Sequence, residues 1–121
     1  MPSLRQPPRV GEVWYVDFDP QVGREQAGIR PALVLSNDGF NLAPNGLVFA
    51  APITRTDRGL PAHLRVEAGV AGLPKTSFIL CDQAGAISEL RFLRQRGVIP
   101  DEMLTEARRI VGRFIDAHLI F

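Results

Sequence analysis

Short apolar segments followed by one amphipathic helix constrain the fold of this chain more than any other sequence feature. Segments rich in β-branched and aromatic residues, or alternating between apolar and polar, predict short strands. They cover residues 10–18, 31–36, 47–54, 63–67, 76–83 and 86–90. This order predicts a mainly β fold: five to seven short strands in a small, strongly bent sheet or barrel.

The last part of the chain has a helical period instead. Pro100 is followed by Asp101 and Glu102, and both residue types favour a helix start. Apolar residues then recur mostly three or four positions apart: Met103, Leu104, Ala107, Ile110, Val111, Phe114, Ile115 and Leu119. We expect this C-terminal helix to cover one opening of the barrel.

Three connecting features complete the predicted organisation. Residues 19–30 read as a polar loop, long enough to suggest a function or disorder. Residues 37–45 hold Asn-Asp-Gly and Pro-Asn-Gly and predict a plain connection. Pro52, inside the 47–54 segment, predicts an edge strand or a bulge, because proline cannot donate to a ladder.

The 121 residues predict one domain over 9–121, preceded by a proline-rich extension, residues 1–8, that we expect to be mobile. The start lacks the apolar core of a signal peptide and no apolar run is long enough for a membrane span, so we expect a cytoplasmic protein.

The single Cys81 excludes an intrachain disulfide, and the distant His63 and His118 offer no short-spaced metal ligands. The net charge of +1 alone gives no reason to expect a nucleic-acid partner.

The 19–30 loop holds the densest polar residues. Arg30 precedes a proline, which favours an extended backbone, and its planar guanidinium matches phosphate oxygens. Glu25 is close enough in sequence to approach Arg30, but the two could equally form an ordinary surface ion pair. Thr54, at a strand end, could bond a phosphate or be a common strand residue. Trp14 suits either the core or base stacking.

Several blocks together resemble one known family. The run from Arg9 to Pro20, the stretch GREQAGIRPALVLS, Ala51-Pro52-Ile53-Thr54, SFILCDQ and the closing helix are similar to MazF/PemK-type toxins of type II toxin–antitoxin systems. The resemblance covers about residues 9–119. It implies an SH3-like barrel, a homodimer and a MazE-type antitoxin as partner.

The resemblance also implies an activity: sequence-specific endoribonuclease cleavage of single-stranded RNA, chiefly mRNA, without a metal or other cofactor, causing growth arrest. The family's active-site residues fall on Arg30, Thr54 and Glu25. For RNA binding we expect the following residues: Trp14, Arg24, Gln26, Arg55 and Gln83.

Two other functions are compatible with such a fold. A toxin of the same fold could poison DNA gyrase without catalysis. A peptide-binding SH3-like module is less well supported, because grooves for proline-rich peptides need several exposed aromatic residues and this chain has one Trp and one Tyr.

Overall fold

The computed structural model describes residues 6–19 and 28–119. Its elements, in chain order, are β1 (Glu12–Asp17), β2 (Ile29–Val34), α1 (Asp38–Leu42), β3 (Leu47–Thr54), β4 (His63–Val66), η1 (Val70–Gly72), β5 (Ser77–Leu80), η2 (Cys81–Gln83), β6 (Gly85–Ser88), η3 (Glu89–Arg91), β7 (Phe92–Val98) and α2 (Asp101–Leu119), where η marks a 3₁₀ turn. Residues 1–5 of the predicted extension lie outside the described residues, and Pro8 is buried.

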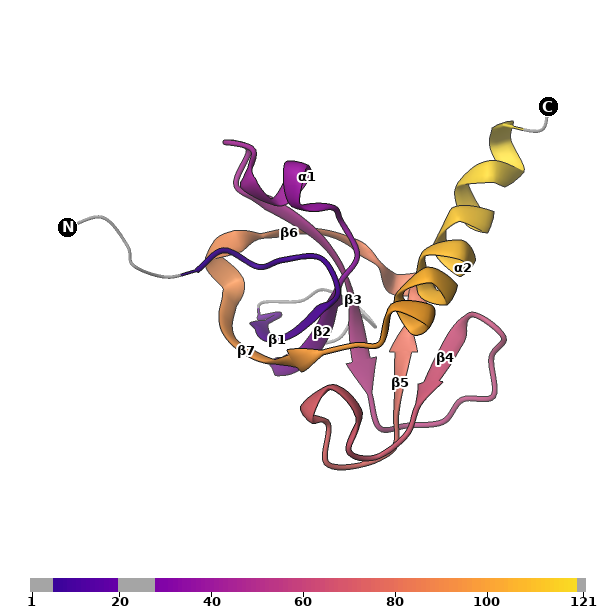
Figure 1. The fold of residues 1–121 in the computed structure, drawn as a ribbon. Coiled ribbons are helices and arrows are strands. Elements are labelled where there is room, and N and C mark those ends of the chain that lie inside the picture. The colour runs from indigo at the N-terminus through magenta and orange to yellow at the C-terminus, as the bar shows by residue number, and fades with distance from the viewer. Residues whose placement is uncertain (1–5, 20–27, 120–121) are drawn as a thin grey trace.

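The strands form a seven-stranded antiparallel sheet. Its order is β4-β5-β3-β2-β1-β7, and β6 pairs with β3. Figure 1 shows the chain from β6 to β7 curving around β1. The mainly β class and the strand number are confirmed, but the sheet is open: among the described residues the end strands β4 and β7 do not pair with each other. The expected barrel is therefore not closed.

The core divides into two clusters because side chains alternate across each strand. Leu33 of β2 and Ile53 of β3 join one cluster, while Ala32 and Val48 join the other. The second cluster also contains Trp14, which packs edge-on against Phe92 of β7 with ring centroids 6.2 Å apart. One sheet thus supports two apolar layers.

Helix α2 seals the first cluster, as its apolar period predicts. Ala107 and Ile110 are buried there, and the Arg108 Nε donates to the Leu35 carbonyl at 2.9 Å. In Figure 1 the start of α2 lies beside β5, and its far end projects away from the sheet. The predicted C-terminal helix is confirmed. Among the described residues, no helix is long and apolar enough to cross a membrane.

The prediction of a plain connection over residues 37–45 is wrong in one respect, because this segment contains the short helix α1. The Asn37 side chain accepts a hydrogen bond from the Phe40 backbone N–H at 2.9 Å and so caps the helix. Asn41 is buried and holds Ser36 through its amide. Asn is favoured both in turns and at helix starts, so composition alone did not separate the two.

The prediction that Pro52 marks an edge or a bulge is also wrong. β3 is a central strand, and Pro52 pairs with Ala32 of β2. On its other side β3 pairs with β6 up to Ala50 and with β5 from Ile53 onward. Pro52 lies in the gap between these two partners, where a missing N–H costs no ladder bond.

The sequence patterns missed β7 and made the strand predicted over residues 76–83 too long. β5 ends at Leu80, and the chain continues as the turn η2. In β7 only Phe92 is buried, while Leu93, Arg94 and Gln95 are exposed. Three successive exposed side chains break the apolar alternation by which strands are predicted.

Candidate active site

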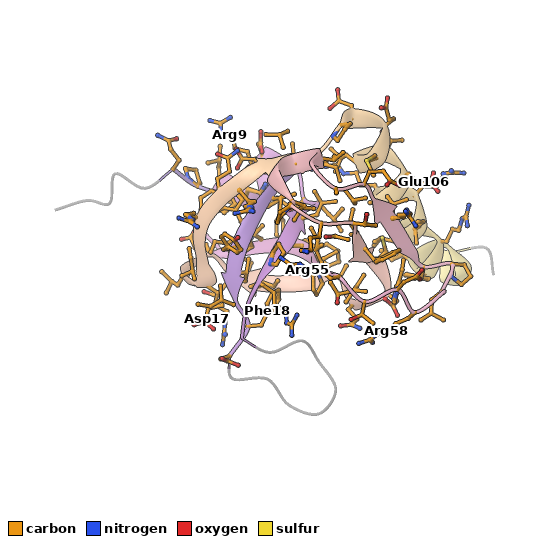
Figure 2. The ribbon with its side chains drawn as sticks, turned by 90° about the horizontal axis from the view of Figure 1, so that it is seen from below. Arg9, Asp17, Phe18, Arg55, Arg58 and Glu106 are labelled. Carbon is orange, nitrogen blue, oxygen red and sulfur yellow. The ribbon has the colours of Figure 1, made fainter. Side chains whose placement is uncertain are left out.

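A pocket of about 360 Å³ opens where β1, β2, β3 and β7 meet the turn before β5. Its lining consists of Tyr15, Ile29, Arg30, Pro31, Ile53, Thr54, Arg55, Thr56, Leu73, Pro74, Ser77 and Arg96. Figure 2, seen from below, labels Arg55 near the middle of the molecule and Arg58 farther along the same loop. Three predicted site residues, Arg30, Thr54 and Arg55, therefore share one pocket.

Strand pairing explains why Arg30 and Thr54 lie at the same pocket. Ala32 of β2 pairs with Pro52 of β3 at the end of an antiparallel ladder. Arg30 lies two residues before Ala32 and Thr54 two residues after Pro52, so both lie beyond the same end of this ladder, and both line the pocket. β2 begins at Ile29, two residues before the predicted start, so the backbone of Arg30 is fixed by pairing with Val16 of β1.

The Thr54 hydroxyl is placed to donate a hydrogen bond to a ligand. Thr54 is buried, and its Oγ1 accepts from the Thr56 backbone N–H at 3.2 Å. A hydroxyl that accepts in this way keeps its own hydrogen for another partner. By contrast, the Ser77 hydroxyl donates to the Lys75 carbonyl at 2.8 Å.

Arg96 of β7 is a pocket residue that the sequence analysis missed. Its Nε donates to the Gly72 carbonyl at 2.8 Å, and its guanidinium carbon lies 5.2 Å from the centre of the Tyr15 ring. A guanidinium held by both a carbonyl and an aromatic ring has little freedom to move. The signal in the sequence was the alternation Arg94-Gln95-Arg96, which places both arginines on one side of an extended strand.

The pocket is strongly positive although the chain is nearly neutral. Arg30, Arg55 and Arg96 line it, and within the described parts of the chain no Asp or Glu does. Arginine stays charged at all physiological pH values, and its fork of N–H donors matches phosphate oxygens. The pocket is therefore suited to a phosphate group.

The other predicted site residues lie elsewhere. Arg24, Glu25 and Gln26 lie outside the described residues. Trp14 is in the core, 5% exposed, with its Nε1 donating to Glu12, so the expectation that it stacks on RNA bases is not supported by its position. Gln83 is half-buried in η2 and does not line the pocket.

Hydrogen bonds join the described residues on either side of the segment that carries Glu25. The Phe18 N–H donates to the Gly28 carbonyl at 2.9 Å, and the Gly28 N–H donates to the Asp19 carboxylate at 2.8 Å. Arg91 donates to the carbonyls of Asp17, at 3.0 Å, and Asp19. These bonds bring the chain back to β2 next to Arg30.

Two chemically capable side chains lie away from the pocket. Cys81 is buried, and burial raises the pKa of its thiol to about 11, with smaller contributions from Asp82 and Glu106. It is therefore a poor nucleophile at neutral pH. The His63 Nε2 lies 3.0 Å from an Asp82 oxygen, outside the pocket lining. Neither side chain can act on a ligand bound in the pocket.

A protein-family model matches nearly the whole chain. Residues 9–115 match the model of the PemK-like, MazF-like toxin of type II toxin–antitoxin systems. Endoribonuclease EndoA of Bacillus subtilis (strain 168) is 35% identical over 110 residues, which are 88% of this chain and 95% of the relative. Endoribonuclease MazF of Staphylococcus saprophyticus is 28% identical over 93% of this chain and 94% of its own.

Solved structures agree in fold. MazF (Form-I) from Deinococcus radiodurans superimposes with a TM-score of 0.82 at 30% identity, covering 93% of this chain and 99% of that one. A MazE–MazF complex (Form-II) from the same organism gives a TM-score of 0.76 at 27% identity, covering 92% and 97%.

Proposed function

Because the chain belongs to the PemK-like, MazF-like toxins of type II toxin–antitoxin systems, we propose that it is an endoribonuclease that cleaves single-stranded RNA, chiefly mRNA, at specific sequences. One observation carries the proposal: Arg30 and Thr54 converge in a pocket lined by three arginines and, among the described residues, by no carboxylate. The endoribonuclease names of the two curated relatives support it.

RNA supplies its own nucleophile, so the pocket needs to do only part of the chemistry. The 2′-OH attacks the neighbouring phosphorus, a P–O2′ bond forms, and the P–O5′ bond breaks. The 2′-OH loses its proton and the leaving 5′-oxygen gains one. The products are a 2′,3′-cyclic phosphate and a 5′-OH end. DNA lacks the 2′-OH, and we expect it not to be cut.

Arg30 and Thr54 have separate tasks in this step. Negative charge grows on the phosphoryl oxygens in the transition state, and the Arg30 guanidinium stabilises it. Thr54 donates its free hydroxyl hydrogen to the same phosphate, which also holds the phosphorus in line with the 2′-oxygen. Glu25 either accepts the 2′-OH proton or orients Arg30. We favour orientation, because a carboxylate paired with arginine is a weaker base.

The family also implies partners. We propose that the toxin forms a homodimer in the cytoplasm and is neutralised by a MazE-type antitoxin whose acidic or amphipathic tail occupies the arginine-lined groove. A complex of MazE with MazF, at 27% identity to this chain, supports the antitoxin. A saturating antitoxin that left the cleavage rate unchanged would contradict a shared groove.

Cleavage of a long mixed-sequence RNA in EDTA, with the cut ends mapped, tests the function. We expect cuts at one short sequence, with cyclic-phosphate and 5′-OH ends. Arg30→Ala should lower kcat by about 10²- to 10³-fold while circular dichroism stays unchanged. Full activity of Arg30→Ala would refute the mechanism. Absence of any RNA cleavage, together with inhibition of DNA gyrase, would favour the non-catalytic toxin.

A further inference from the structure

A second hollow adjoins the active-site pocket. Its volume is about 310 Å³, and its lining is Tyr15, Ile29, Leu93 and Arg94. Tyr15 and Ile29 also line the first pocket, so the two hollows share a wall. A chain-like ligand that leaves the first pocket over this wall enters the second.

Two arginines of β7 stand against the shared Tyr15 ring. The guanidinium carbons of Arg94 and Arg96 each lie 5.2 Å from its centre, and they face different hollows: Arg96 lines the first and Arg94 the second. Tyr15 and Arg94 are also paired across β1 and β7. Ring and guanidinium groups together offer flat surfaces of the kind on which nucleobases stack.

The turn η1 supports this arrangement from behind. A Cβ added to Gly97 would lie 2.4 Å from the Ala71 carbonyl oxygen, and one added to Gly72 would lie 2.5 Å from the Arg96 carbonyl oxygen. The backbones of η1 and β7 are thus in direct contact, and the Gly72 carbonyl holds Arg96 by its Nε. Arg96 is fixed before any ligand binds.

Charge runs continuously through both hollows. Their linings together contain Arg30, Arg55, Arg94 and Arg96 and, among the described residues, no Asp or Glu. The sugar–phosphate backbone repeats a negative charge at every nucleotide, whereas a protein partner would need its acidic side chains at the same spacing. An RNA strand is therefore the ligand that best fits both the charges and the flat surfaces.

Resting on the function proposed above, we propose that Tyr15, Arg94 and Arg96 form a subsite for the nucleotide adjoining the scissile phosphate. Arg94 and Arg96 bind the phosphate of that nucleotide. Its base stacks on the layer that these guanidinium groups form with Tyr15. The subsite contributes binding of the strand and leaves the chemical step to Arg30 and Thr54.

Charge-removing variants and a shortened substrate test the subsite together. Arg94→Gln with Arg96→Gln should raise KM for a long RNA roughly tenfold or more, and should flatten the log–log salt slope of binding to an uncleavable deoxy-substituted RNA by about one unit. Arg96 also lines the active-site pocket, so the effect on the chemical step is tested with Arg94→Gln alone. This single variant should raise KM for the long RNA, leave kcat within about threefold and equal the wild type on a dinucleotide that holds only the scissile phosphate, because Arg94 lines the second hollow and not the first.

Arg113→Gln, at an exposed arginine of α2, is the matched control and should change none of these values. Unchanged KM and salt dependence in the double variant would overturn the subsite, as would an equal loss of the Arg94→Gln variant on the dinucleotide and on the long RNA. Weakened antitoxin binding with unaltered RNA binding would assign the surface to a protein instead. Failure of the wild type to cleave any RNA would refute the proposed function. If RNA binding in that case still depended on Arg94 and Arg96, the subsite itself would be upheld.

Discussion

Thr54 shows at the residue scale how position makes a common side chain useful. It is the last residue of β3, and the following turn returns the Thr56 N–H to its hydroxyl oxygen. The hydroxyl is thereby oriented without losing its hydrogen. A residue type that is usually only a good strand former becomes a directed donor in a pocket of arginines.

Replacing Thr54 by valine should therefore lower kcat. Valine keeps the shape and removes the donor to a charged phosphate, a loss of about 1.5–3 kcal/mol, which corresponds to roughly 10- to 150-fold. Thr54→Ser keeps the hydroxyl and should retain most of the rate. Single-turnover cleavage of one defined RNA measures both. Equal rates for the Thr54→Val variant and the wild-type protein would remove Thr54 from the mechanism.

Cys81 makes the free energy of unfolding depend on pH in the alkaline range. Burial raises the pKa of its thiol to about 11, from 9.0 as the ordinary value. Because the pKa of the thiol is higher in the folded state than in the unfolded state, its contribution to stability is complete below about pH 9 and is lost as pH rises toward 11. The difference between these two pKa values corresponds to a loss of at most about 2.7 kcal/mol.

Urea unfolding of wild type and Cys81→Ala at several pH values isolates this effect, because all other titrations cancel in the difference. The wild type should lose more stability than the variant between pH 9 and 11. Parallel pH profiles would show that the thiol does not titrate differently in the two states.

Individual residues were predictable from the sequence to different degrees. Arg30 and Thr54 could be named because they lie in recognisable blocks, and in the structure both line the same pocket. Arg96 could not, because its role depends on Tyr15 and on the Gly72 carbonyl, both far away in sequence. For Trp14 the sequence allowed core or surface, and only the position of Phe92 decides for the core.

At the scale of elements, the contact between η1 and β7 is the most sensitive to substitution. A methyl group on Gly97 would collide with backbone atoms of Ala71, which cannot rotate away as a side chain can. We expect Gly97→Ala to lower the free energy of unfolding by about 1–3 kcal/mol. It should also weaken RNA binding, because Arg96 loses its support.

The matched control for that variant is Gly112→Ala. Gly112 is in α2, and a Cβ there meets nothing within 4 Å. Alanine in a helix is favoured over glycine by roughly 0.5–1 kcal/mol, so this variant should gain stability. Chemical denaturation of both proteins gives the comparison. A Gly97→Ala variant as stable as wild type would mean that η1 is readily displaced.

Elements were predictable where burial gives the sequence a clear apolar pattern. The 47–54 strand is a continuous apolar run buried along most of its length, the C-terminal helix has an apolar face, and both were found with correct or nearly correct bounds. β7 has three successive exposed side chains after Phe92, so its sequence shows no apolar alternation. α1 depends on a single Asn cap, which resembles a turn in sequence.

On the scale of the whole molecule, charge is distributed unevenly. Four arginines line the two adjoining hollows, whereas the net charge of the chain is +1. Because Arg94 and Arg96 share one phosphate, these arginines neutralise two or three phosphates of a single strand, which gives a log–log salt slope of about −1.4 to −2.1. Raising salt from about 50 to about 200 mM should therefore weaken RNA binding roughly 7- to 18-fold, measurable by fluorescence anisotropy on an uncleavable strand.

A DNA strand of the same sequence is the control: it should show a similar slope and remain uncut. A slope near zero would contradict phosphate binding as the basis of affinity. Net charge could not have indicated this behaviour, because it does not say where charges gather. Sheet closure was equally hidden from the sequence, since it depends on whether β4 and β7 reach each other.

The open end of the sheet has a further consequence. A terminal strand offers its outer backbone groups to any other strand, including one from a second molecule, and exposed charges along it discourage such pairing. Arg94 is an exposed charge of this kind on β7, and the half-buried Arg96 lies two residues farther along the same strand. If the proposed subsite is correct, the arginines that bind substrate would also discourage edge-to-edge pairing of β7 with a second molecule.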